Sequence, residues 1–271
     1  MKQQSDSLLE LVPRSSSDDG DVSEPFQFLM TKIKYLESKG SQFRPDVVEY
    51  FRIQDLMRHA YEAKLGYQFS KRLFDKVAAA LLVALLSPVL VLIGIAIKLS
   101  SPGPILYSQL RVGQYGTLFT IYKFRTMRVG ADADLGVTYL NTKVLVDSRV
   151  TAVGRLLRNF KFDELPQLLN VLTGQMSLVG PRPHGPDEIA MQEKMLWSRL
   201  SVPPGLTGLW QATLPNSVDG HRKLRRDMVY LRKRSFALDL WILFKTFRVV
   251  ALGERLLEST YKKSKTSRLA A

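Results

Sequence analysis

The sequence predicts an α+β, mainly helical fold with a few short strands and one helix that enters a membrane. Three observations support this: an uncharged apolar run at 77–97, several segments with helical spacing of apolar residues, and two short apolar and aromatic runs near the middle of the chain. The length of 271 residues suits one domain with an extension. We expect an N-terminal extension at 1–66, partly disordered with amphipathic helices, and a main domain at 67–271.

The formal net charge is +14 and the chain has no cysteine. Disulfides and thiolate metal sites are therefore excluded, and a reducing, cytosol-facing location fits. The basic excess indicates an anionic partner, which can be a nucleic acid, an acidic lipid or a phosphorylated substrate. Residues 1–25 hold six acids and two bases, so the excess belongs to the rest of the chain.

No charged residue interrupts the 21 positions of the run 77–97, which is long enough to cross the apolar core of a bilayer. Lys76 precedes the run and Lys98 follows it. Pro88 removes a helical donor, and the hydroxyl of Ser87 can satisfy a carbonyl that this frees. The run is either a kinked spanning helix or a helix–break–helix that returns to the same face. A buried helix of a soluble core is the third interpretation.

The remaining chain alternates short strands and helices. We expect strands at 105–107 and 118–122, a polar loop at 128–148, and helices at 150–160, 164–172, 187–200, 219–234 and 236–250. The basic helix at 219–234 suits either nucleic acid or anionic lipid headgroups. The last helix mixes aromatic and basic residues, so it either lies in a membrane interface or packs on the domain core.

Two adjacent acids, Asp163 and Glu164, are the first candidates for chemistry. Pro166 follows them, and proline is tolerated only in a first helical turn. The pair therefore lies where a loop becomes a helix, and both carboxylates can point into one pocket there. Acids at a helix N-terminus also stabilise the helix dipole without any further role.

Bases surround this acid pair in the sequence. Lys123 and Arg125 end a predicted strand, Arg149 and Arg158 precede the pair, and Arg182 follows it between two prolines. Guanidinium groups match phosphate oxygens. Acids among bases suit phosphoryl transfer, in which one carboxylate attacks phosphorus and another holds Mg²⁺.

The chain resembles the bacterial sugar transferases, also called monotopic phosphoglycosyl transferases, over about residues 70–250. The motifs that carry the resemblance are Lys71-Arg72-Leu73-Phe74-Asp75, Ser87-Pro88, Ser101-Pro102-Gly103-Pro104, Lys123-Phe124-Arg125, Asp147-Ser148-Arg149-Val150-Thr151, Asp163-Glu164-Leu165-Pro166-Gln167, Met176 to Pro183, Pro204-Gly205-Leu206-Thr207-Gly208, Gln211, Asp227, Tyr230 and Asp239.

The resemblance implies roles for individual residues. Asp163 is expected to be the nucleophile and Glu164 the Mg²⁺ ligand beside it. Lys123, Arg125, Arg149, Arg158, Arg182 and Gln211 are expected to bind substrate. Ser87 and Pro88 are expected to form the break of a re-entrant membrane helix at 73–98, which makes the domain monotopic.

The implied reaction transfers a phosphosugar from a UDP-sugar to undecaprenyl phosphate and releases UMP. We expect this on the cytoplasmic face of the bacterial inner membrane, among membrane lipids, without nucleic acid and with a possible homodimer. A basic adaptor without catalysis and a glycosyl transferase that releases UDP are the two rival interpretations. Lys161-Phe162 and the stretch 209–215 depart from the family pattern, which puts the donor preference in question.

Overall fold

The computed structural model describes residues 65–130, 149–186, 194–215, 218–252 and 261. Its elements are, in chain order, α4 (Leu65–Ser100), β1 (Leu106–Val112), η1 (Gln114–Gly116), β2 (Leu118–Phe124), α5 (Ala152–Asn159), η3 (Phe162–Gln167), α6 (Leu168–Leu172), β3 (Ser177–Val179), η4 (Lys194–Ser201), β4 (Gly205–Thr207), α8 (Leu209–Thr213), α9 (Gly220–Lys233) and α10 (Phe236–Leu252). The described part is mainly helical with a few short strands, which confirms the predicted composition of the fold. The extension predicted at 1–66 and most of the loop predicted at 128–148 lie outside the described residues, and the domain boundary stays a prediction.

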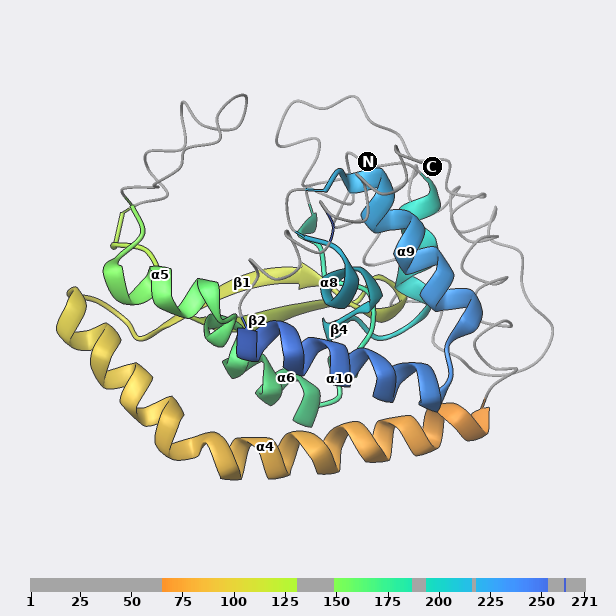
Figure 1. The fold of residues 1–271 in the computed structure, drawn as a ribbon, viewed down its shortest axis with the longest axis horizontal. Coiled ribbons are helices and arrows are strands. Elements are labelled where there is room, and N and C mark those ends of the chain that lie inside the picture. The colour runs from red at the N-terminus through yellow and green to blue at the C-terminus, as the bar shows by residue number, and fades with distance from the viewer. Residues whose placement is uncertain (1–64, 131–148, 187–193, 216–217, 253–260, 262–271) are drawn as a thin grey trace, which may run out of the picture.

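The longest element is α4, which runs along one edge of the molecule and bends on its way (Figure 1). It is a single helix through Ser87 and Pro88. The sequence left a kinked helix and a helix–break–helix open, and the break that the family resemblance implied there is not present. The reason is local: Pro88 cannot donate to the carbonyl of Ala84, and the Ser87 hydroxyl donates to that carbonyl instead, at 2.8 Å. The helix therefore keeps its hydrogen bonding while it bends.

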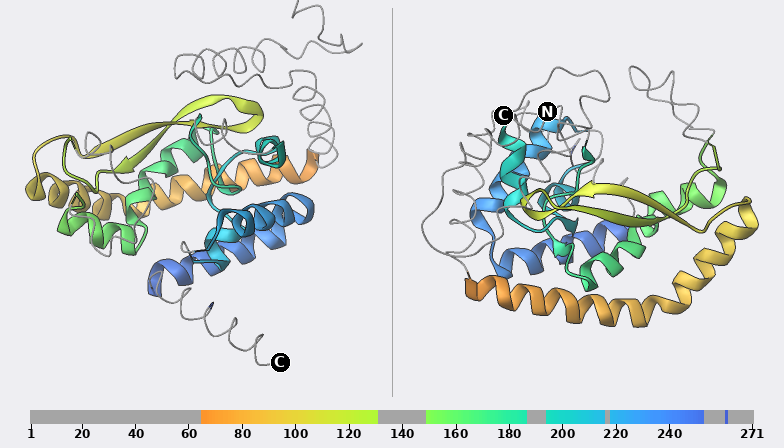
Figure 2. Two further views of the ribbon diagram at one scale, coloured as in Figure 1. Left: turned by 90° about the horizontal axis from the view of Figure 1, so that it is seen from above. Right: turned by 180° about the vertical axis from the view of Figure 1, so that it is seen from behind.

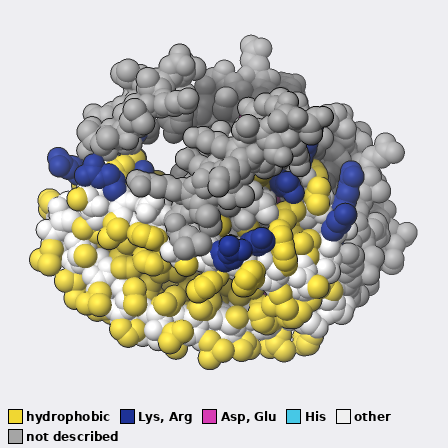
Figure 3. Space-filling model, viewed as in Figure 1, with side chains coloured by type: hydrophobic (Ala, Val, Ile, Leu, Met, Phe, Trp, Pro, Cys, Tyr) yellow, Lys and Arg dark blue, Asp and Glu magenta, His cyan; other side chains and the backbone are white. Residues whose placement is uncertain are grey.

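The apolar part of α4 is open to its surroundings rather than buried. Its most apolar 18-residue window has a mean hydropathy of 2.9 and is 17% buried, and Leu81, Leu85 and Leu92 are each at least 65% exposed. Figure 3 shows apolar side chains over the lower half of this face of the molecule. A core helix of a soluble domain buries most of its length, so that interpretation does not fit. By length and composition α4 can cross a membrane; whether it crosses or re-enters stays a prediction.

Strands β1 and β2 form an antiparallel hairpin, in which Leu106 lies opposite Phe124 and Val112 opposite Leu118. Phe119 and Ile121 of β2 are buried, and the two-residue period of a strand places Lys123 on the same face of the hairpin. The hairpin and helices α9 and α10 lie on opposite sides of α4 when seen from above (Figure 2). Because Lys123 shares a face with the buried Phe119 and Ile121, its side chain points toward the interior of the domain and not to its surface.

The core forms where α4, β2, α6, β3 and α10 meet. Its buried members include Ala79, Ile121, Leu168, Leu178 and Ile242. Strands and helices that are short by themselves are held in place by this shared core.

Two strands that are parallel neighbours, β3 and β4, position the turn after β3. The Gly180 amide donates to Thr207 at 2.9 Å, and the Gly205 amide donates to the Pro181 carbonyl at 2.8 Å. A Cβ on Gly205 would lie 2.1 Å from the Gly180 nitrogen, so only glycine permits this approach. The approach fixes the backbone that leads into Arg182.

Candidate active site

The acid pair lies in η3, the short 3-10 helix that precedes α6. Its N-cap, Lys161, has a left-handed backbone with φ 57°, an uncommon conformation for a residue with a Cβ. This turn follows α5 directly, and Pro166 lies inside η3. Asp163 and Glu164 thus lie where a loop becomes a helix, as the sequence predicted.

Glu164 lies between two bases that come from distant parts of the chain. Its Oε1 atom is 3.1 Å from Lys123 Nζ on β2 and 3.0 Å from Arg182 Nη2 on the turn after β3. Burial raises the pKa of Glu164, but the charges of Arg182 and Lys123 outweigh burial and hold that pKa at about 2. Glu164 is therefore ionised at any physiological pH.

Asp163 has a different environment from its neighbour. Within the described residues no base forms an ion pair with its carboxylate, and burial together with the charge of Glu164 raises its pKa, although Lys123 and Arg158 act in the opposite direction. A carboxylate without a fixed partner retains a lone pair for attack on phosphorus. The two acids thus differ: Glu164 is fixed by cations, and Asp163 is available.

Arg158 approaches the acid pair from α5. Its Nε donates to the Thr126 hydroxyl at 2.9 Å, and its charge lowers the pKa of Asp163. A close approach of backbones brings α5 there, because a Cβ on Gly154 would lie 2.1 Å from the Thr126 carbonyl oxygen. The structure therefore brings Lys123, Arg158 and Arg182 together with both acids.

A shallow pocket beside Glu164 extends this group. Lys123, Glu164 and Arg182 line it together with Gln167, which the sequence named only as part of a motif, and Arg111, which it did not single out. Arg111 lies opposite Phe119 in the hairpin, so its side chain is on the same face of the hairpin as Lys123. The pairing of the two strands is known only from the fold, and the sequence alone therefore could not identify Arg111.

Three residues predicted to bind substrate have other contacts. Arg125 is buried, and its guanidinium donates to the Ser101 and Pro102 carbonyls at 2.7 and 2.8 Å. Gln211 is buried in α8 and contacts the Leu206 carbonyl at 3.5 Å. The Arg149 carbonyl accepts from the Arg128 amide at 3.0 Å. The structure does not join these three to the acid pair through any of these contacts, and substrate binding by them stays a prediction.

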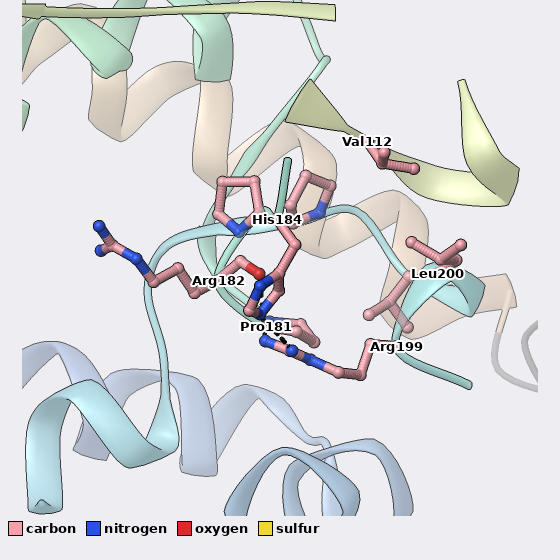
Figure 4. A pocket seen from close by; sticks show the side chains of 10 residues that line it. Val112, Pro181, Arg182, His184, Arg199 and Leu200 are labelled. Carbon is pink, nitrogen blue, oxygen red and sulfur yellow. Dashed lines mark hydrogen bonds between the residues drawn. The ribbon is translucent and has the colours of Figure 1, made fainter. Parts of the chain in front are cut away.

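Figure 4 shows what holds the turn that carries Arg182. Arg199 of η4 is buried, donates to the Arg182 carbonyl at 3.1 Å, and contacts the ring of His184. Its Nη2 also lies 2.7 Å from Asp227 Oδ2 on α9. Burial raises the pKa of Asp227 to about 6 even though the charge of Arg199 lowers it. His184, which the sequence left between a surface role and a substrate contact, is half-buried and belongs to this support.

A divalent cation is the one cofactor that the sequence predicts. Within the described residues no three His, Cys, Asp or Glu side chains gather in a way that could hold a metal ion. Mg²⁺ needs only one or two carboxylates when substrate phosphates complete its shell. Both cations contact Oε1 of Glu164, so Oε2 of Glu164 and the carboxylate of Asp163 fit such a partial site.

Comparison with known proteins gives one family. The model of the family described as bacterial sugar transferase matches residues 66–253. An undecaprenyl-phosphate galactose phosphotransferase of Salmonella typhimurium is 38% identical over 199 residues, which is 69% of this chain and 42% of that protein. The exopolysaccharide production protein ExoY of Sinorhizobium fredii is 39% identical over 195 residues, 68% of this chain and 86% of that protein.

A third relative, an undecaprenyl-phosphate glucose phosphotransferase of Komagataeibacter xylinus, is 41% identical over 191 residues, 66% of this chain. The chain spans 42% and 35% of the Salmonella and Komagataeibacter proteins. The region 66–253 that the family model matches runs from the second residue of α4 to the end of α10, and it contains both acids and the bases Lys123, Arg158 and Arg182.

Proposed function

The chain belongs to the bacterial sugar transferase family, and we propose that it transfers a phosphosugar from a UDP-sugar to undecaprenyl phosphate through a covalent intermediate on Asp163. The observation that carries the proposal is the difference between the two acids: Glu164 is fixed between Lys123 and Arg182, and Asp163 has no ion pair with a base of the described residues. The names of relatives support the lipid acceptor, since they are undecaprenyl-phosphate sugar phosphotransferases.

The first half of the reaction forms one bond and breaks one. An oxygen of Asp163 attacks the phosphorus that bears the sugar, and the bond from that phosphorus to the bridging oxygen breaks. UMP leaves with the bridging oxygen and its electron pair. Lys123 and Arg182, which flank Glu164, would stabilise the charge on the donor phosphates, and Arg158 lies near the charge of the attacking carboxylate.

The second half regenerates the enzyme. A phosphate oxygen of the lipid attacks the same phosphorus, and the bond to Asp163 breaks, so that the carboxylate returns and the lipid carries a sugar diphosphate. Glu164 would hold Mg²⁺ through Oε2, and a bound Mg²⁺ would neutralise the phosphates of the donor. The direct contact of Glu164 with two bases keeps its carboxylate ionised, which binding of a cation requires.

The proposed membrane location rests on α4. Its exposed apolar surface supports insertion into the inner membrane, with the basic remainder of the domain at the cytoplasmic face. The lipid phosphate and the soluble nucleotide then meet at one surface. A homodimer stays a prediction.

The test is the identity of the released nucleotide. Full-length protein in detergent, with Mg²⁺ and undecaprenyl phosphate, is given a panel of UDP-sugars, and UMP and UDP are separated by chromatography. The proposal requires UMP release that depends on Mg²⁺ and disappears in Asp163→Asn. Release of UDP would support an ordinary glycosyl transferase instead, and equal turnover by the variant would contradict the role of Asp163.

A further inference from the structure

Helix α9 has an exposed basic face that the proposed reaction does not use. At 100° per residue, positions 222, 225, 226, 229, 232 and 233 fall within an arc of about 120°. All six are exposed, whereas Asp227 and Tyr230 on the other side of the helix are buried. Val229 lies at the centre of the arc, and the rest of the basic face consists of Arg222, Arg225, Arg226, Arg232 and Lys233. The face runs for about 17 Å along the helix and contains no acid.

Most bases of this face have no acid to neutralise them. Arg222 Nε lies 3.2 Å from Asp219 Oδ2, and the other four bases form no ion pair with any residue that the structure describes. Bases that lie three or four residues apart on a helix repel one another. The face therefore suits an anionic occupant, which would relieve this repulsion.

The same chain contains an acidic segment of matching charge and length. Residues 18–24, Asp18-Asp19-Gly20-Asp21-Val22-Ser23-Glu24, hold four acids and no base. Seven residues reach at most about 25 Å, which is enough to follow the basic face from one end to the other. The four acids thus match in number the four bases that have no ion pair.

The connection between this segment and α4 can bring the segment to the face. The described chain begins beside the C-terminal end of α9, because Tyr67 of α4 and Tyr230 of α9 both donate to Asp239, at 2.7 and 2.9 Å. Figure 1 shows the start of α4 beside the lower end of α9. The connection has 40 residues, 25–64, and its reach of up to about 130 Å is several times the length of the face. Two parts of one chain that can meet have an effective concentration on the order of millimolar, so weak ion pairs are enough to hold them together.

We propose that the acidic segment 18–24 docks on the basic face of α9 in the same molecule. The ion pairs neutralise the bases, and the docked segment keeps other anionic polymers off a surface that would otherwise attract them. The proposal does not rest on the phosphosugar reaction, because neither the segment nor the face includes a residue of the acid pair or of the bases around it.

Pulsed electron paramagnetic resonance of the full chain in nonionic detergent measures this docking directly. The chain has no cysteine, so Ser23→Cys and Val229→Cys together introduce the only two sites for nitroxide labels. We expect a narrow distribution of label distances below about 25 Å, since Val229 is at the centre of the face. The distribution should shift to longer distances in 1 M salt, which reduces the Debye length to about 3 Å. A distribution that salt does not change would overturn the proposal.

A tenfold excess of unlabelled protein distinguishes docking within one molecule from docking between two. The short distances should persist in this mixture, because each labelled chain carries both its segment and its face. Loss of the short distances would show that the segment comes from a second copy, and this would overturn the proposal as well.

Charge variants show which residues make the contact. Arg225→Glu with Arg226→Glu should abolish the short distances, and Asp18→Lys with Asp19→Lys in the same chain should restore them. The two arginines are exposed, so the variants should fold, and far-UV circular dichroism checks this. Short distances that survive the reversal of both arginines, or that the second pair of substitutions does not restore, would contradict the assigned surface.

The matched control reverses two exposed bases elsewhere. Arg155 lies on α5, and the Arg128 amide donates to the Arg149 carbonyl just before that helix, at 3.0 Å. Helix α5 lies at the opposite end of the molecule from α9 (Figures 1 and 2). Arg128→Glu with Arg155→Glu should therefore keep the short distances, and their loss in this control would show that net charge rather than the basic face decides the result.

Binding of a 20-nucleotide polyuridine RNA, followed by fluorescence anisotropy, shows whether the face is covered. A docked fraction of about nine tenths would lower the apparent affinity for a competing polyanion about tenfold. Replacement of the four acids of segment 18–24 by their amides should therefore tighten RNA binding about tenfold, and Arg225→Glu with Arg226→Glu should reverse this gain. Equal RNA binding with and without the four acids would show a face that is open to nucleic acid and would overturn the proposal.

Discussion

Replacement of Glu164 by glutamine should destabilise the domain in a way that depends on pH. Burial raises the pKa of Glu164, and Arg182 and Lys123 more than reverse this, so the folded value is about 2 against an ordinary 4.5. A depressed carboxyl pKa stabilises the fold above the unfolded pKa, and this stabilisation is lost as pH falls through the folded value. At about 1.4 kcal/mol per pH unit, the ionised group contributes about 3 kcal/mol at pH 7 and roughly 1 kcal/mol at pH 3.

The assay is denaturant-induced unfolding in nonionic detergent, followed by far-UV circular dichroism at pH 7 and pH 3. Glu164→Gln should lose about 3 kcal/mol at the higher pH and much less at the lower. Asp163→Asn is the matched control, because the pKa of Asp163 is raised and removal of its charge should not destabilise the fold at pH 7. An equal loss by Glu164→Gln at both pH values, or an equal loss by the control, would refute the assignment of the ion pairs.

Three further predictions concern the backbone, the acid limb of activity and the membrane helix. Gly205→Ala places a Cβ against backbone atoms and should cost about 3 kcal/mol of unfolding free energy, whereas Gly220→Ala, which meets nothing within 4 Å, should unfold like the wild type. Arg158→Gln removes a charge that lowers the pKa of Asp163, so the pH below which UMP release fails should rise; no shift, or a fall, would contradict the contact. Ser87→Ala removes a hydrogen bond in α4 and should lower stability by about 1 kcal/mol in detergent; a wild-type unfolding curve would show that the hydroxyl is not needed beside the proline.

The position of the acid pair could be predicted from the sequence because local features determine it. Asp163 and Glu164 are adjacent, Pro166 restricts them to a helix start, and the structure has them there in η3. The hairpin and helices α5, α9 and α10 could be predicted for the same reason, since each has its own periodicity. Strands β3 and β4 have three residues each, and no period is visible in so short a segment.

The roles of individual bases required the fold. Lys123 lies on β2 and Arg125 directly follows that strand, but of the two only Lys123 contacts Glu164; Arg125 closes the turn after α4. Both were predicted to bind substrate, because the sequence shows the charge of a residue but not where its side chain points. Arg111 and Arg199 were missed because their positions depend on strand register and on an ion pair to Asp227. The break predicted in α4 is a bend, since the serine beside the proline supplies the lost donor.

The most direct test of the central claim is the mass of the enzyme itself. Wild type and Asp163→Asn are incubated with the UDP-sugar that turns over and Mg²⁺, without lipid acceptor, and their intact masses are measured after acid quenching. The account requires an adduct equal to one phosphosugar on the wild type, located at Asp163 by peptide mapping and removed by undecaprenyl phosphate, with no adduct on the variant and a loss of turnover of about four orders of magnitude or more. Lipid-linked product without any adduct, or an adduct on another residue, would contradict it.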